Sequence, residues 1–338
     1  MRCRVPLFLD ARISYLLLVG LHYLKLVGQK VFMHAHLPSL MKKEDILIVS
    51  DLHLCEGDAS PNEDFFYDKE FSHFLDHFGA AKTLLIINGD FIDFLQVTSK
   101  GGFSDLTDNE RRFGLGTEEN KSVFKLRAVF HAHKRFFAAL ARFVSQGNRV
   151  VILPGNHDME FFWPRVRETF FEELERIKKI PAIRSRIQFL PWFYYEPGFL
   201  YVDHGCQYDP INSYDNFLYP LLPNNPRQLD LPFGSFLVRY LFNLIEKTDP
   251  LADNFKPPIK YINVALQRDP LHVAQTISRY VPALLRIWVK SVSSQNPSEQ
   301  HRIEQENNRR LVALAKQHQI PLSTISQLVS LWSRSLLH

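Results

Sequence analysis

Carboxylate, imidazole and amide side chains occur at four places along the chain, each directly after a short apolar run. The first place holds Asp51 and His53, the second Asp90 and Asp93, the third Asn156, His157 and Asp158, and the fourth Asp203 and His204. In an extended chain, residues two apart point the same way, so Asp51 and His53 can bind one ion together. Mixed carboxylate and imidazole ligands suit Mn, Fe or Zn better than Ca. The pattern therefore indicates a transition-metal site.

The apolar runs before these clusters predict the strands that must position them. Each run is short and rich in β-branched or other apolar residues, as buried strands are. The runs cover residues 45–50, 83–87, 150–153 and 199–202, with a further expected strand at 187–190. Helical periodicity lies between them, over residues 64–79, 121–146 and 164–179. This alternation predicts an α/β core, in which ligands bind at the carboxyl edge of the strands.

The rest of the chain divides by composition. Residues 99–120 and 210–233 are rich in turn-forming residues, so both are expected to be loops. Further helices are expected over residues 234–248, 259–290, 311–319 and 322–337. The predicted domains are an N-terminal extension (1–40), a core (41–209), a helical cap or insertion (210–305) and helices returning to the core (306–338).

No single cluster is specific. A strand-end Asp is usually a turn or cap residue, and a lone His204 is more often a hydrogen-bonded structural histidine. The information lies in the order of the clusters, namely D-x-H, then G-D-x-x-D, then G-N-H-D, then H-G, each after a strand. The apolar stripes of residues 210–305 fit helix packing as well as a ligand pocket.

The segments SDLHL, NGDFID, PGNHD and DHG resemble the calcineurin-like metallophosphoesterase family. The resemblance implies a four-layer α/β/β/α sandwich and two divalent cations, with Mn²⁺ favoured over Fe or Zn²⁺. It implies that Asp51 and His53 bind the first cation, that Asn156 and His204 bind the second, and that Asp90 bridges both. Two cations about 3.5–4 Å apart neutralise a phosphate ester and lower the pKa of a water between them.

The resemblance also assigns residues around the metals. His157 would lie close to the substrate and protonate the leaving group, so His157 and Asp90 are the predicted catalytic residues. Asp93 and Asp158 would contact the ligands rather than the metals. The expected activity is hydrolysis of a phosphoester or pyrophosphate bond in a phosphorylated small-molecule or lipid-linked substrate.

The stretch HGCQYDPINSYDNF is similar to the UDP-2,3-diacylglucosamine hydrolase group, which cleaves a pyrophosphate in a lipid A precursor. That group usually has Arg where this chain has His157, which favours a broader phosphoesterase relative.

The family pattern ends in a strand followed by Gly-His-x-His, and this chain contains no Gly-His pair. Each metal would then lack one imidazole. We expect a C-terminally incomplete core, an apolar sheet edge exposed near the site, and low or absent activity in this chain. The alternative is a catalytically impaired or non-catalytic binding protein of the same fold.

Composition limits partners and location. The 338 residues include 40 basic and 36 acidic side chains, a net charge of +4, so no nucleic-acid partner is expected. Three dispersed cysteines predict no disulfide framework and a cytoplasmic protein.

Residues 13–28 have membrane character, but they are shorter than the about 20 apolar residues that a spanning helix needs. They fit a helix lying on the inner face of a membrane, a weak export signal, or a stretch outside the natural protein. The last is favoured, because Met41 opens a compact domain start, and residues 1–40 are expected to be dispensable for folding.

Overall fold

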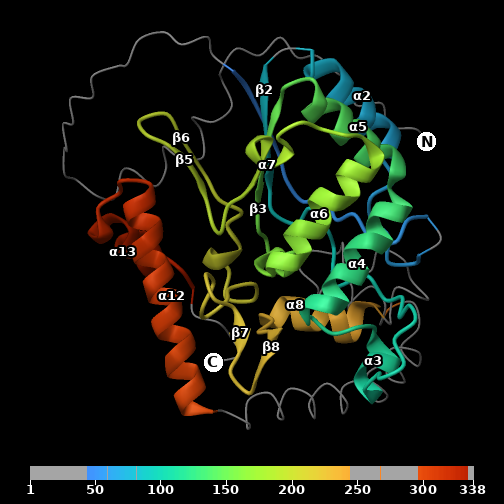
Figure 1. The fold of residues 1–338 in the computed structure, drawn as a ribbon. Helices are drawn as coiled ribbons and strands as arrows, with labels where there is room; N and C mark the ends of the chain where they lie inside the picture. Colours follow the sequence, from blue (N-terminus) through green and yellow to red (C-terminus); the bar gives the residue numbers. More distant parts are fainter. Residues whose placement is uncertain (1–43, 59, 81, 244–266, 268–295, 334–338) are drawn as a thin grey trace. The chain divides into compact units, whose positions relative to one another are not determined.

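The computed structural model describes residues 44–58, 60–80, 82–243, 267 and 296–333, all within the compact unit Lys43–His338 (Figure 1). The expectations for residues 1–40, for most of 259–290 and for the end of 322–337 fall outside these ranges. Within them, no helix is long and apolar enough to cross a membrane.

A four-stranded parallel sheet forms the centre of the fold. Its strands lie in the order β1 (Asp45–Val49), β2 (Thr83–Asn88), β3 (Arg149–Leu153) and β4 (Ile187–Phe189). Parallel neighbours require crossover connections, and helices provide them. The strands expected at 45–50, 83–87, 150–153 and 187–190 are confirmed, and the carboxyl ends of these parallel strands share one edge of the sheet.

One face of this sheet packs against helices. In β2, Leu85 and Ile87 point into a large apolar cluster with Phe136 and Phe170, because alternate residues of a strand face the same side. The helices that contribute to this layer are α2 (Asp68–Phe78), α4 (Glu119–Ala132), α5 (Lys134–Ser145) and α6 (Pro164–Ile177).

The other face packs against a second, smaller sheet. Strands β5 (Tyr194–Glu196) and β6 (Leu200–Val202) form an antiparallel hairpin, and Val202 joins Leu84 and Ile86 in one apolar cluster. Behind the hairpin, α12 (Pro297–Gln317) and α13 (Leu322–Ser330) share a cluster with Trp192 and Phe193. The layers therefore run helix, sheet, sheet, helix, as predicted (Figure 1).

Short elements complete the described part of the chain. They are α3 (Asp108–Phe113), η1 (Met159–Phe162), α7 (Ile183–Arg186), η2 (Cys206–Tyr208), β7 (Leu221–Leu222), β8 (Asn225–Leu229), α8 (Phe233–Leu237) and the π-helical turn η3 (Val238–Phe242).

Two of the predicted loops contain regular structure. Within 99–120, Thr107 and Glu110 form a reciprocal capping box that starts the short helix α3 among the turn-forming residues. Within 210–233, β7 and β8 pair as a hairpin despite the prolines. Packing against residues far away in sequence stabilises this hairpin, since Leu221 and Leu229 are buried in the apolar cluster that includes α12.

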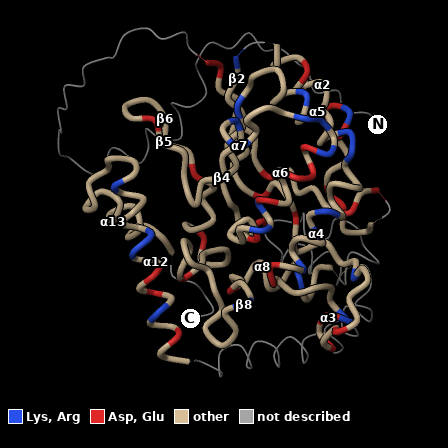
Figure 2. Tube along the Cα trace, in the orientation of Figure 1, with Lys and Arg blue, Asp and Glu red and all other residues tan. Residues whose placement is uncertain are grey.

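Helix α12 begins fourteen residues before the helix predicted at 311–319. Its first part is polar, so hydrophobic periodicity could not reveal it. The side chain of Asn296 caps the helix by accepting from Glu299 N, and ion pairs such as Arg309–Glu306 stabilise its surface. Figure 2 shows basic and acidic residues interspersed along α12.

The single helix predicted over 121–146 is wrong at His133, which ends α4 and begins α5 with φ −99° and ψ 44°. The ring of His133 is buried between two carboxylates. Its Nδ1 lies 3.0 Å from Asp68 Oδ1 and its Nε2 lies 3.2 Å from Glu63 Oε2. Burial alone would lower the pKa of His133, but the two carboxylates raise it to about 9.

We expect the free energy of unfolding to decrease as the pH rises from about 6.5 to 9. The protonated His133 stabilises the fold fully below its unfolded pKa of about 6.5, and this contribution, about 3 kcal/mol, is lost as the pH passes the folded value. Urea unfolding of the wild type and His133→Gln at both pH values isolates the effect. Equal pH dependence in the two proteins would contradict it.

Candidate metal centre

The predicted ligands of the first three clusters meet at the carboxyl edge of the parallel sheet. Past the ends of β1 and β2, Asp51 N donates to Gly89 O at 3.2 Å and His53 N donates to Asp90 O at 2.9 Å. Beyond β3, His157 N donates to Asp90 Oδ1 at 2.9 Å. The first two contacts join backbone atoms and extend the pairing of β1 with β2, and the Asp90 carboxylate connects the segment after β3 to them.

The fourth cluster reaches the same edge from the other sheet. His204 follows β6, which belongs to the hairpin rather than to the parallel sheet. Asn88 Nδ2 donates to Asp203 O at 3.0 Å, and His204 Nδ1 lies 2.8 Å from Asn88 O. The end of β2 therefore anchors the fourth cluster beside Asp90.

Two glycines leave space for the ligand side chains. A Cβ atom at Gly89, whose φ is +78°, would lie 2.3 Å from His204 Nδ1. A Cβ atom at Gly155 would lie 2.1 Å from Asp90 Oδ1. Any larger residue at either position would displace a predicted ligand.

Three predicted ligands have a left-handed backbone conformation. The φ angles are 55° at Asp51, 50° at His53 and 49° at Asp90. Such conformations cost non-glycine residues about 1–3 kcal/mol each and occur where the surrounding structure enforces them, often at functional sites. Nothing in the sequence marked these residues as strained.

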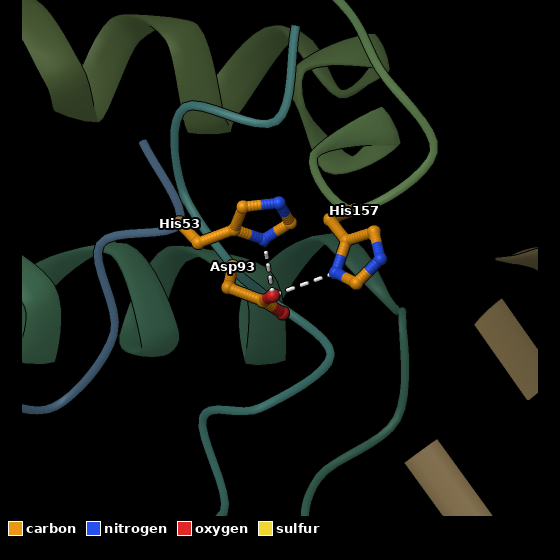
Figure 3. Close-up of side chains that lie close together, drawn as sticks. All are labelled: His53, Asp93 and His157. Carbon is orange, nitrogen blue, oxygen red and sulfur yellow. Dashed lines mark hydrogen bonds and ion pairs between the residues drawn. The ribbon is translucent and has the colours of Figure 1, made fainter. Parts of the chain in front are cut away.

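The imidazoles of His53 and His157 converge on one carboxylate, as Figure 3 shows. Asp93 Oδ2 lies 2.9 Å from His53 Nδ1 and 2.6 Å from His157 Nδ1. An ionised carboxylate only accepts hydrogen bonds, so both Nδ1 atoms carry hydrogen. The Nε2 atoms of both rings are then left for other partners, as in metal sites where a carboxylate orients a histidine ligand.

The Nε2 atoms of His53 and His204 both approach the carboxylate of Asp90. His204 donates from Nδ1 to the Asn88 carbonyl, which leaves its Nε2 3.4 Å from Asp90 Oδ2. His53 Nε2 lies 3.6 Å from the same oxygen. Asp90 is 4% exposed, so its carboxylate is buried among these rings.

Two groups of side chains in the described residues could hold a metal ion, and within each group the ligand atoms lie within 4.8 Å of one another. The first group is Asp51, Asp90 and His204, and the second is His53, Asp93 and His157. The first group holds three of the five predicted ligands, namely Asp51 from the first ion's set, His204 from the second ion's set and the predicted bridge Asp90, while His53 falls in the second group. The second includes the Asp93 oxygen that accepts from two rings, so this group is better described as the hydrogen-bonded support of His53 and His157.

Asp158 and Asn156 have different environments. Asp158 is fully buried and accepts from Gly155 N at 2.6 Å and from Phe91 N at 2.8 Å, so it joins the segments that follow β2 and β3. Asn156 is 7% exposed and its Nδ2 lies 3.4 Å from Asn212 Oδ1.

A family model for calcineurin-like phosphoesterases matches residues 45–233. The chain belongs to the calcineurin-like phosphoesterase family. Membership implies metal-dependent hydrolysis of phosphoesters, divalent metal cofactors and phosphorylated substrates, and it agrees with the carboxylate and imidazole groups at the sheet edge. A search of curated proteins and a search of solved structures each found no match.

The ionisable groups of this phosphoesterase site shift one another's pKa values. Burial alone would raise the pKa of Asp90, but His157, His204 and His53 together hold it well below its ordinary value. Burial would lower the pKa of His204, yet Asp90 raises it to about 9. Burial and the charge of Asp90 raise the pKa of Asp158 to about 7. A metal ion would therefore displace protons from the imidazoles when it binds near neutral pH.

Sequence reasoning missed two residues that support the ligands. The Asn88 carbonyl accepts from His204 and, at 2.8 Å, from Ser50 Oγ. Ser50 Oγ, which has a single hydrogen to donate, also lies within hydrogen-bond reach of Asp51 Oδ2. Every residue has a carbonyl group, so no side-chain pattern could single out Asn88.

Proposed function

We propose that this chain hydrolyses a phosphoester or pyrophosphate bond with two divalent metal ions, Mn²⁺ being preferred over Fe or Zn²⁺. In this proposal Asp51 and His53 bind the first ion, Asn156 and His204 bind the second, and Asp90 bridges them. One observation carries the proposal: Asp51, Asp90 and His204 converge from two sheets, and His53 Nε2 is directed at Asp90 Oδ2.

The residues present fit such metals, because His53 and His204 each have Nδ1 hydrogen bonded to an oxygen and Nε2 directed at Asp90 Oδ2. When bound, the ions would neutralise the phosphate and lower the pKa of the attacking water. His157 would donate its Nε2 proton to the leaving-group oxygen. Asp93 would keep the Nδ1 proton of that ring in place and so stabilise its charged form. Burial would raise the pKa of Asp93, but His157 and His53 hold it well below its ordinary value, so the carboxyl stays ionised.

The proposed substrate class is a nucleotide sugar or a lipid-linked phosphate. Two observations support it. The stretch from His204 to Phe217 is similar to the UDP-2,3-diacylglucosamine hydrolase group. The side chains of Tyr208 and Ile211 in the same stretch are each 39% exposed. They would form an apolar contact surface for part of a substrate or for a membrane.

A binding protein of the same fold is the second candidate. One observation favours it: no Gly-His pair occurs in the sequence, so the two histidines that end the family pattern have no counterpart here. Three protein ligands can hold a metal together with water, but more weakly. This candidate predicts metal binding without turnover.

The test is hydrolysis of bis-p-nitrophenyl phosphate, p-nitrophenyl phosphate and a UDP-sugar, each with Mn²⁺ and with EDTA. We expect hydrolysis with Mn²⁺ at rates below the usual range of about 1–10³ s⁻¹, abolished by EDTA and restored by excess Mn²⁺. Metal binding without hydrolysis of any substrate would favour the binding protein. Equal rates with Mn²⁺ and EDTA would overturn metal-dependent catalysis.

A further inference from the structure

Residues that come after the four predicted ligand clusters hold the backbone of Asn156. The carbonyl oxygen of Asn156 accepts from Tyr214 Oη at 3.3 Å and from Ser235 Oγ at 2.9 Å. Tyr214 is 5% exposed and Ser235 is fully buried. Two buried hydroxyl groups from outside the sheet therefore fix where residue 156 lies.

The side chain of Asn156 is held by a second pair of residues from the same region. Asn156 Nδ2 donates to Asn212 Oδ1 over a long 3.4 Å, and Asn212 Nδ2 donates to Asp209 Oδ2 at 2.9 Å. The other oxygen of Asp209 accepts from Ile211 N at 3.0 Å. The contacts thus form a relay from Asp209 through Asn212 to Asn156.

The carboxylate sets the orientation of both amides in this relay. An ionised carboxylate can only accept, so Asn212 must turn its NH₂ group toward Asp209 and its oxygen toward Asn156. Asn156 must then turn its NH₂ group toward Asn212 and donate to Asn212 Oδ1. This orientation directs the oxygen Oδ1 of Asn156 away from Asn212. Hydrogen-bond networks are the means by which amide orientation is assigned in general.

Gly234 provides the space that this arrangement requires. Its nitrogen donates to Ile211 O at 2.7 Å, which places its backbone against the relay. A Cβ atom at residue 234 would lie 2.2 Å from Asn212 Oδ1. Only glycine allows the α8 segment to approach Asn212 so closely.

We propose that Asp209 and Asn212 are positioning residues that direct the amide oxygen of Asn156 at the second metal ion. The inference rests on the proposed function, in which Asn156 binds that ion. A flipped amide would present its NH₂ group, which carries no lone pair for a cation. Removing the relay should therefore lower the affinity for the second ion. The affinity for the first ion, held by Asp51 and His53, should stay unchanged.

Calorimetric titration of the metal-free full chain with Mn²⁺ tests this directly. We expect Asn212→Ala to lower the affinity for the second ion by about 10–100-fold, as loss of a ligand's hydrogen-bond partner does. The affinity for the first ion and the urea midpoint of the metal-free protein should stay unchanged. Asp209→Asn should lower the affinity for the second ion by a smaller factor than Asn212→Ala does. In a protein that already carries Asn212→Ala, Asp209→Asn should have no further effect. Asn224→Ala, an exposed asparagine in the same region, is the matched control and should leave both affinities unchanged.

The outcomes separate this inference from the proposed function. If Asn156→Ala loses the second ion but Asn212→Ala and Asp209→Asn keep it, the relay is wrong and the metal assignment stands. If the unaltered chain takes up no Mn²⁺, both are wrong. Equal weakening of both ions, or a lowered urea midpoint without metal in both relay variants, would show a general structural role and overturn the inference.

Discussion

Asp90→Asn is expected to remove bound metal and hydrolytic activity together while the fold survives. The asparagine keeps an oxygen to accept from His157 N, but it loses the negative charge that two adjacent cations and the nearby imidazoles require. Loss of a ligand's partner costs about 10–100-fold in affinity or activity, so loss of the bridging ligand should cost more than about 10²-fold. Elemental analysis and the Mn²⁺-dependent assay measure the two effects.

Asp108→Asn is the matched control, because the side chain of Asp108 is fully exposed in the first turn of α3. It should keep both metal content and rate. Circular dichroism should show the wild-type fold in both variants. Retention of full metal content by Asp90→Asn would remove Asp90 from the metal site.

His157→Ala is expected to keep the metal content and to reduce the rate by about 10²–10⁴-fold, the usual contribution of a general acid. His157 Nδ1 is engaged by Asp93, so its Nε2 is the atom available to a leaving group. The loss should be smaller for p-nitrophenyl phosphate than for an alkyl phosphate or a UDP-sugar, since p-nitrophenolate leaves without protonation. Rates for both kinds of substrate, with elemental analysis, check this.

His73→Ala, an exposed histidine on α2, serves as the control and should change neither quantity. An equal loss of rate for every leaving group would argue against proton transfer by His157. Loss of a metal ion in His157→Ala would instead make His157 a ligand, as the grouping with His53 and Asp93 allows.

The sheet edge was predictable because its signals are local. Each of β1, β2 and β3 is a short apolar run followed at once by polar residues, and parallel pairing then places those residues at one edge. The amphipathic helices that cover one face were predictable for the same reason. His204 was found through its own tripeptide, although its strand belongs to the second sheet.

The remaining features depend on partners far away in sequence. The break at His133 arises from Glu63 and Asp68, about seventy residues earlier, and no helical pattern could reveal it. The contact between Asn156 and Asn212 joins residues 56 apart. Hydrogen bonding of the histidine Nδ1 atoms likewise depends on the folded arrangement, because the acceptors Asp93 and Asn88 come from other segments.

The metal content of the unaltered chain tests the central claim most directly. Metal-free protein is titrated with Mn²⁺, dialysed and analysed by elemental analysis, with Asp90→Asn treated in parallel. The account predicts saturable uptake approaching two Mn²⁺ per chain, the second bound more weakly, and loss of uptake in the variant. A folded wild-type chain that takes up no Mn²⁺, or a variant that takes up as much as the wild type, would contradict it.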